Sequence, residues 1–171
     1  SFNLTERWYL SQIEKRWDAN SNRLITDTLH KFTRAHNYSF STGLNTKIYG
    51  MVQFNKSKIS AIRHVITPNL SFNYTPDFSD EKYGYYKTVQ TDSIGNTQQY
   101  SIMNNGVYGS PSTGKSGNIS LGFTNILEMK IRSKKDTVES FKKIKLFENL
   151  SFKSSYNIFA DSLNLNDITL N

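Results

Sequence analysis

Apolar and polar side chains alternate one by one along several long stretches of the chain. The clearest stretch runs from Tyr38 to Phe54 and reads YSFSTGLNTKIYGMVQF. Its even-numbered positions are mostly aromatic or aliphatic, whereas its odd-numbered positions are mostly polar. A period of two residues places alternate side chains on opposite faces of a β-strand, and no helical period fits as well. The pattern therefore predicts one long strand with one apolar face.

The same alternation recurs and predicts about six strands in all. The further strands are predicted over 2–10, 68–74, 118–132 and 146–160, with a truncated last strand from about Leu165. Strands in soluble β-proteins typically have ~5–6 residues, whereas a tilted strand needs roughly 9–11 residues to cross a bilayer. A strand from Tyr38 to Phe54 would extend for about 55 Å, so that part of it would stand above a membrane.

The predicted connections also differ in length in a regular way. They are a long loop (18–37), a short turn (55–60), a very long loop (77–117) and a moderate one (133–145). This order is typical of outer-membrane barrels, which have long extracellular loops and shorter periplasmic turns, although the short connection DSLNLN breaks it. We therefore predict an all-β fold, an antiparallel transmembrane β-barrel. About six strands cannot close a barrel, because single-chain barrels begin at eight strands. Residues 1–171 are thus expected to be part of one barrel domain, with no complete domain boundary in view.

Composition supports β-structure and leaves several partners possible. The chain has 10 tyrosines, 11 phenylalanines and no cysteine, which excludes disulfides and thiolate metal sites. Its formal net charge of +7 suits nucleic acid, an anionic membrane surface or an acidic ligand. However, the basic residues are dispersed, and their one cluster, RSKKDTVESFKKIK, also carries acids and no interleaved aromatic platform. We expect no nucleic-acid partner.

The segment GSPSTGKS, from Gly109 to Ser116, matches the phosphate-binding pattern G-x-x-x-x-G-K-[ST]. That pattern binds nucleotides where a helix begins directly after it. Here the following residues, GNISLGFTNILEMKI, alternate as a strand, and no Walker B run is present. The sequence therefore predicts a loop that re-enters a strand, with no bound nucleotide.

Four basic residues fall on the polar faces of the predicted strands, which line the lumen in a membrane barrel. They are Lys47, Lys130, Arg132 and Lys153. A charge that faces lipid costs ~2–4 kcal/mol at mid-bilayer, which favours the lumen for all four. They could keep a wet interior soluble or pair with Glu128 and Glu148, or they could form a weakly cationic path for an anionic ligand. The alternation places Glu148 itself on the apolar face, so we expect it near a turn at the membrane edge.

Histidines and aromatic residues add little evidence for catalysis. His30, His36 and His64 are scattered and have no carboxylate at ligand spacing, so no metal or other cofactor is predicted. A hydrolase triad that uses His64 stays open, although no nucleophile stands out. Aromatic residues gather at the ends of the predicted strands, as in an interfacial girdle: Trp8, Trp17, Tyr38, Phe40, Phe54, Tyr74 and Phe78.

Three stretches carry a resemblance to a known family. They are IYGMVQFNKSKISAIRHVITPNLSFNYTPDFS (48–79), NGVYGSPSTGKSGNISLGFTNILEMKIRSKKDT (105–137) and KKIKLFENLSFKSSYNIFADSLN (142–164). They resemble the barrel domain of the LPS-assembly protein (LptD) family of the Bacteroidetes group. The step from Arg63 to Pro68, with Tyr74 and Pro76, is also similar to a shorter motif of proteobacterial relatives. The resemblance covers 38–171 well and 1–37 loosely, and its motifs are structural rather than catalytic.

This resemblance implies a large β-barrel of the bacterial outer membrane. Such proteins receive lipopolysaccharide from a periplasmic bridge protein and release it into the outer leaflet through a lateral opening. They work with a lipoprotein plug of the LptE type and are embedded in membrane lipid. The expected function is lipopolysaccharide transport without catalysis. The alternatives are another outer-membrane barrel such as a porin or secretion channel, a barrel-embedded hydrolase, or a soluble β-rich binding protein.

Overall fold

The computed structural model describes residues 1–132 and 141–171, and its regular structure is β-strand apart from one 3-10 helix. The elements are β1 (Phe2–Tyr9), β2 (Gln12–Asp18), β3 (Arg23–Leu29), β4 (Thr33–Asn45), β5 (Ile48–Gln53), β6 (Ile59–Thr75), η1 (Glu81–Tyr83), β7 (Tyr86–Gln90), β8 (Thr97–Ser101), β9 (Ser116–Arg132), β10 (Phe141–Asn157) and β11 (Thr169–Leu170). No helix in this part of the chain is long and apolar enough to cross a membrane.

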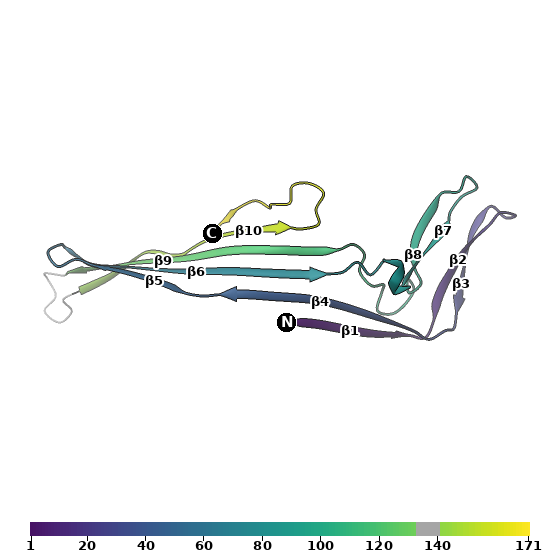
Figure 1. Ribbon diagram of the computed structural model, residues 1–171, viewed down its shortest axis with the longest axis horizontal. Helices are drawn as coiled ribbons and strands as arrows, with labels where there is room; N and C mark the ends of the chain where they lie inside the picture. Colours follow the sequence, from purple (N-terminus) through teal and green to yellow (C-terminus); the bar gives the residue numbers. More distant parts are fainter. Residues whose placement is uncertain (133–140) are drawn as a thin grey trace. The chain divides into compact units, whose positions relative to one another are not determined.

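The longest strands belong to one sheet (Figure 1). Its hydrogen-bonded order is β1-β4-β6-β9-β10-β11, and β5 also pairs with β6. The hairpins β2–β3 and β7–β8 form two separate two-stranded sheets. Each pairing whose register is described is antiparallel. The predicted all-β, antiparallel class is therefore confirmed.

The predicted strand over 38–54 is interrupted once. β4 ends at Asn45 and β5 begins at Ile48. In the register of β5 with β6, Ile48 lies opposite Ile66, and Thr46 still donates a backbone hydrogen bond of 3.3 Å to the Pro68 carbonyl. Pro68 has no N–H and cannot return that bond, so the ladder loses one bond at this point.

Two predicted loops were wrong in part, because they contain strands. The 18–37 segment holds β3 and the beginning of β4, and the 77–117 segment holds η1 and the hairpin of β7 with β8. The described residues thus contain eleven strands rather than about six. Of the predicted connection 133–145, residues 133–140 lie outside the described residues, and β10 already begins at Phe141.

The chain divides into two compact units. The first contains Ser1–Phe40 and Tyr74–Ser116, and the second contains Ser41–Asn73 and Gly117–Asn171. The first unit has a packed core in which Phe78 is fully buried. The Phe78 ring lies 5.4 Å from the ring of Tyr38 and 5.1 Å from that of Tyr83. Phe78 is therefore a core residue and Tyr38 packs against the core, which corrects their predicted place in an aromatic girdle.

Candidate functional site

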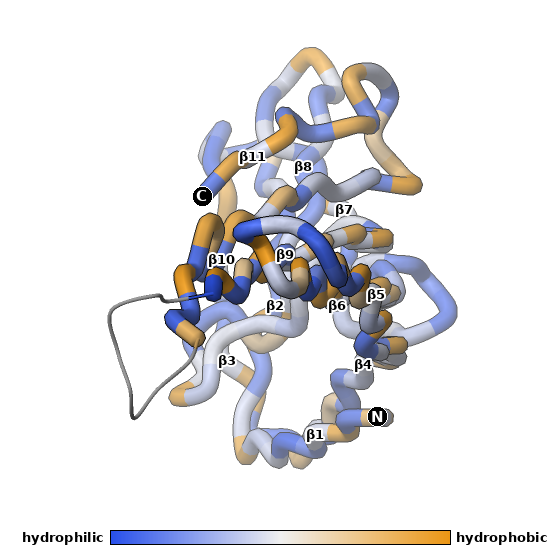
Figure 2. Tube along the Cα trace, turned by 90° about the vertical axis from the view of Figure 1, so that its left-hand side faces the viewer, coloured by the Kyte–Doolittle hydropathy of each residue, from blue (hydrophilic) through white to orange (hydrophobic). Residues whose placement is uncertain are grey.

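Register divides the strands of the second unit into an apolar and a polar face. Phe123 of β9 lies opposite Phe152 of β10, and Ser120 lies opposite Ser155. Residues that are directly opposite in a sheet share a face, and successive residues alternate between faces. Figure 2 shows hydrophobic and hydrophilic positions following one another along these strands.

The apolar face is not covered by other residues of the described chain. Leu121 is 46% exposed, Phe152 is 38% exposed and Leu44 is 67% exposed. Large apolar side chains that are exposed as a contiguous face mark an interaction surface rather than a water-facing one. The same division continues into β5 and β6, where Val52 lies opposite Ile62.

A polar cavity of about 510 Å³ lies where β9, β10 and the C-terminal segment meet. Most of its lining residues have polar side chains, although Leu121 and Phe123 also take part; the lining consists of Asn69, Ser120, Leu121, Gly122, Phe123, Thr124, Lys153, Ser154, Ser155, Asn166, Asp167 and Thr169. Lys153 lies opposite Gly122, whose missing side chain leaves the lysine stem room across the strand pair. The arrangement offers hydrogen-bond partners, one cation (Lys153) and one carboxylate (Asp167) to a polar ligand.

The C-terminal segment is fastened to the edge of β10 beside this cavity. Asn166 donates from its backbone N–H to the Ser155 carbonyl at 2.8 Å and from its amide to the Ser155 hydroxyl at 2.6 Å. Ser154 donates in return to the Asn166 carbonyl at 2.9 Å. These bonds fix one wall of the cavity, because the segment before β11 supplies hydrogen-bond partners to Ser154 and Ser155 on the edge of β10.

A second polar cluster surrounds Glu128 on β9. Its carboxylate lies 3.1 Å from the Arg63 guanidinium of β6 and 3.0 Å from the Lys143 ammonium of β10. Glu128 is only 7% exposed. A buried carboxylate needs such compensation, and here two neighbouring strands supply one cation each. These two ion pairs link β6, β9 and β10 across the polar face.

The four basic residues predicted from the sequence have different surroundings. Arg132 donates to the backbone carbonyls of Asn55 at 2.7 Å and Phe54 at 3.1 Å. The Lys130 ammonium lies 4.9 Å from the centre of the Phe141 ring. Lys153 lines the polar cavity, and Lys47 lies between β4 and β5. Lys130 and Arg132 therefore have structural contacts of their own, and the four do not form one cluster.

Sequence reasoning missed Arg63 and Lys143, the two cations that pair with Glu128. Arg63 was missed because the strand that carries it was predicted to begin only at 68, whereas β6 begins at Ile59. The available signal was the number of β-branched residues in ISAIRHVIT, from Ile59 to Thr67, because such residues are enriched in strands. Lys143 could be paired with Glu128 only through the register of β10 on β9, which the sequence alone does not specify.

Glu148 lies in a bulge rather than at a turn, which corrects the prediction for it. The register of β10 on β9 shifts between Lys145 and Phe147 and again between Phe147 and Leu150. Extra residues in one strand move the side chains out of simple alternation. Phe147 instead of Leu146 therefore lies opposite Leu127, and Glu148 forms an exposed ion pair with Lys145.

The GSPSTGKS segment is a loop that leads directly into β9, as predicted. Gly114 adopts a left-handed backbone with a φ of +80° and donates its N–H to the Asp77 carboxylate at 2.9 Å. This is a donor that a phosphate-binding loop would offer to its ligand. Here a carboxylate of the chain accepts this N–H, and a strand rather than a helix follows the loop.

The histidines have no arrangement typical of a metal site or a hydrolase. His64 Nε2 lies 3.2 Å from the Asn125 side-chain oxygen, an amide rather than the carboxylate that orients a catalytic histidine. His36 Nε2 lies 3.2 Å from the Glu6 carboxylate, without the angle of a hydrogen bond. Within residues 1–132 and 141–171, no group of three or more His, Asp or Glu side chains could hold a metal ion.

We predict that Glu128→Gln lowers the temperature of unfolding, because it leaves Arg63 and Lys143 without their shared carboxylate. Glu148→Gln is the matched control, since Glu148 is exposed and pairs with one lysine. Thermal unfolding of the purified protein in detergent should show at least twice as large a fall for Glu128→Gln. Equal falls would mean that the buried cluster contributes no more than a surface pair.

Asp77→Ala is predicted to loosen the GSPSTGKS loop. Hydrogen bonds from the Ser79 hydroxyl, the Ser79 N–H and the Gly114 N–H hold the pKa of Asp77 below its usual range. A lowered pKa in the folded state means that the stabilisation is present above about pH 4 and is lost as the pH falls through the lowered value.

Hydrogen exchange of residues 109–116 measures this effect. In the native protein, exchange corrected for its intrinsic pH dependence should accelerate only below about pH 4, whereas in Asp77→Ala it should be fast at every pH. Asp92→Ala is the control, because Asp92 binds the N–H groups of Ile94 and Asn96 in its own turn. Slow exchange in Asp77→Ala at neutral pH would contradict the assignment.

Comparison with known proteins gives one match. Searches of curated proteins and of solved structures find nothing that matches the chain. A family model described as LptD protein matches residues 1–171, the whole of the chain. The chain therefore belongs to the LptD protein family.

Proposed function

We propose that the chain is part of an outer-membrane β-barrel of the Bacteroidetes LptD type and takes part in lipopolysaccharide transport. The family match is consistent with that role. The observation that carries the proposal further is the two-faced sheet, in which apolar side chains of β4, β5, β9 and β10 lie exposed on one face. In this interpretation, residues 1–171 all belong to one barrel domain.

The length of the strands supports a membrane position. β6, β9 and β10 each have 17 residues. A strand of about 9–11 residues crosses the hydrocarbon of a bilayer when tilted, so each of these strands could cross and extend beyond it. The apolar face would then contact lipid, and the face that carries Glu128 and Lys153 would line an aqueous lumen.

The chemistry of the polar face suits the polar part of lipopolysaccharide. Serine, threonine and asparagine side chains around Lys153 can exchange hydrogen bonds with sugar hydroxyls, and the ammonium can attract phosphate. We propose that sugars and phosphates pass along this face while acyl chains leave sideways into lipid. Lys153 and Lys47 are the residues of the predicted cationic path that we retain, because Lys130 and Arg132 have structural contacts.

The remaining partners follow from the same proposal. A lipoprotein plug of the LptE type would occupy the lumen, and a periplasmic bridge protein would deliver lipopolysaccharide at the short-turn end. The reaction is transport of an amphipathic lipid in which no covalent bond is made or broken. A hydrolase is less well supported, because the nearest polar partner of His64 is the Asn125 amide.

Depletion of the protein in its own cells tests the transport role. We expect surface lipopolysaccharide to fall and its precursors to accumulate in the periplasm or inner membrane. Labelling of surface lipopolysaccharide on intact cells measures the first effect, and fractionation measures the second. Normal surface display after depletion, with the protein still found in the outer membrane, would favour a porin or a secretion channel.

Leu121→Arg and Ser120→Arg test the membrane position as a matched pair. The two residues are adjacent on β9 and point to opposite faces of the sheet. An arginine that faces lipid costs ~2–4 kcal/mol at mid-bilayer, whereas one in an aqueous lumen costs little. We expect Leu121→Arg to reduce the folded protein in the outer membrane several-fold and Ser120→Arg to leave it nearly unchanged. The amount that resists heat denaturation in gel electrophoresis is the measurement, and equal effects would count against a lipid-facing apolar face.

A further inference from the structure

One end of the second unit is built around the turn between β5 and β6. Arg132, the last residue of β9, donates its backbone N–H to the Lys58 carbonyl at 2.9 Å. Its guanidinium also bonds the carbonyls of Phe54 and Asn55 on the other side of the turn. The turn is therefore fastened to the end of β9, and the lysines that it carries are held at a fixed place in the fold.

Two lysines of this turn line a surface cavity. The cavity is lined by Lys56, Ser57, Lys58 and Arg132, and all three turn residues are exposed. Within residues 1–132 and 141–171, no carboxylate lies within 4.0 Å of either lysine ammonium. Ser57 is uncharged, and its hydroxyl oxygen accepts a hydrogen bond from the Ile59 N–H within the turn.

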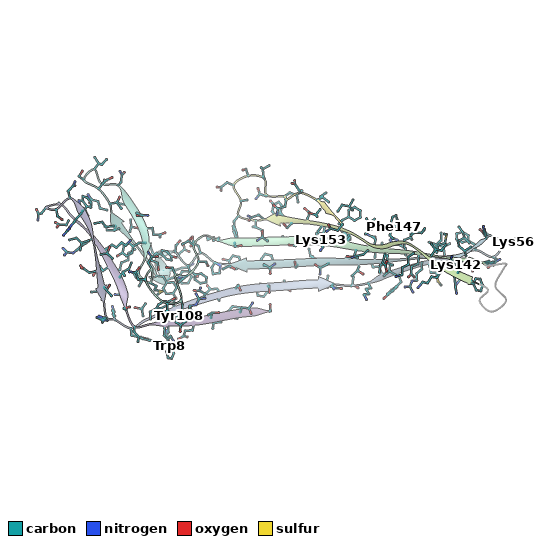
Figure 3. All side chains as sticks on the ribbon, turned by 180° about the vertical axis from the view of Figure 1, so that it is seen from behind. Trp8, Lys56, Tyr108, Lys142, Phe147 and Lys153 are labelled. Carbon is teal, nitrogen blue, oxygen red and sulfur yellow. The ribbon has the colours of Figure 1, made fainter. Side chains whose placement is uncertain are left out.

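A third lysine lies at the same end of the sheet but on its apolar face. Lys142 of β10 is directly opposite Ile131 of β9, and the next apolar pair inward is Ile144 with Met129. Figure 3 labels Lys142 and Lys56 close to one another at this end. A lysine that ends an apolar face can lay its stem along hydrocarbon and extend its charged head to the surface. Among the described residues, Lys142 also has no carboxylate within 4.0 Å.

Several basic residues near this end of the strands differ from these three. Arg63 and Lys143 share Glu128, Lys145 pairs with Glu148, and Lys130 lies over the Phe141 ring. Their charges are compensated within the fold. At this end of the sheet, the lysines of the turn and of the last apolar position have no carboxylate partner among the described residues and can meet an external anion.

From this contrast we infer that Lys56, Lys58 and Lys142 form a basic collar that binds the phosphate groups of anionic phospholipids in the leaflet at this end. The inference rests on the membrane position proposed above. It is based on the position of cations without a carboxylate partner among the described residues directly beyond the apolar face of the strands. This arrangement fits the surface of a bilayer better than it fits a soluble anion. Each lysine near an anionic surface contributes roughly fivefold in affinity, and three together contribute on the order of a hundredfold.

The test uses the full-length protein in a zwitterionic detergent with a fluorescent phosphatidylglycerol as the probe. The collar variant replaces all three lysines by glutamine: Lys56→Gln, Lys58→Gln and Lys142→Gln. The control variant removes the same charge from the first unit: Lys31→Gln, Lys82→Gln and Lys87→Gln. We expect the collar variant to lose on the order of a hundredfold in affinity and most of the salt dependence, and the control to lose less than about fivefold.

Other probes separate the possible sources of the phosphate. Phosphatidylcholine should bind all variants equally, and millimolar inorganic phosphate should not displace phosphatidylglycerol. Displacement by inorganic phosphate would overturn the inference in favour of a free-anion site. A collar variant that lost only lipid A binding and kept phosphatidylglycerol binding would also overturn it, because the collar would then serve the transported lipid.

A third variant guards against misfolding. Lys56→Arg, Lys58→Arg and Lys142→Arg together keep the charge and should keep the affinity, so that loss of binding only in the glutamine variant is due to charge. If the native protein resides in the outer membrane but the glutamine variant binds phosphatidylglycerol normally, the collar is refuted and the membrane position stands. If the protein is recovered from the soluble fraction, the proposed function fails as well.

Discussion

The hydrogen-bonded ladder that keeps apolar and polar side chains on opposite faces is the constraint on which the rest of this structure depends. In the proposed barrel, strands of 17 residues would place a long row of backbone N–H and C=O groups between lipid and an aqueous lumen. Each of those groups needs a partner when water is excluded from one side. Pairing with neighbouring strands supplies the partners, and the alternation of side chains then follows from strand geometry.

The backbone hydrogen-bond ladder is interrupted at a proline, which has no N–H to donate, and at a register shift, where a side chain supplies the missing hydrogen bond. Pro68 removes one donor opposite Thr46, and β4 and β5 separate there. Where the register of β10 shifts before Leu150, the Asn125 amide donates to the Leu150 carbonyl at 3.3 Å. Asn125 is thus a polar residue on a mostly apolar face, and its contact with this carbonyl gives it a structural reason to be there.

The alternation predicted the fold class and the long strands well, because periodicity of two residues is a local signal. The strand predicted over 118–132 corresponds to β9 almost residue for residue. The β2–β3 hairpin was missed because its strands carry many charges and show no clear apolar face. The bulges before Leu150 were missed because a change of register depends on the partner strand. The same reason explains the candidate site: Glu128 was expected to meet a cation, but which cation it meets depends on how three strands are aligned.

Asp77 occupies a backbone donor of the loop that matches a phosphate-binding pattern. The Asp77 carboxylate accepts hydrogen bonds from the Gly114 N–H and from the N–H and hydroxyl of Ser79. A phosphate that used the Gly114 N–H would have to displace this carboxylate. This contact joins the end of β6 to the beginning of β9, although the long connection that contains β7 and β8 separates the two strands in the sequence. The connection between β6 and β9 can therefore change in length among relatives without moving either strand, as long as Asp77 and Gly114 are retained.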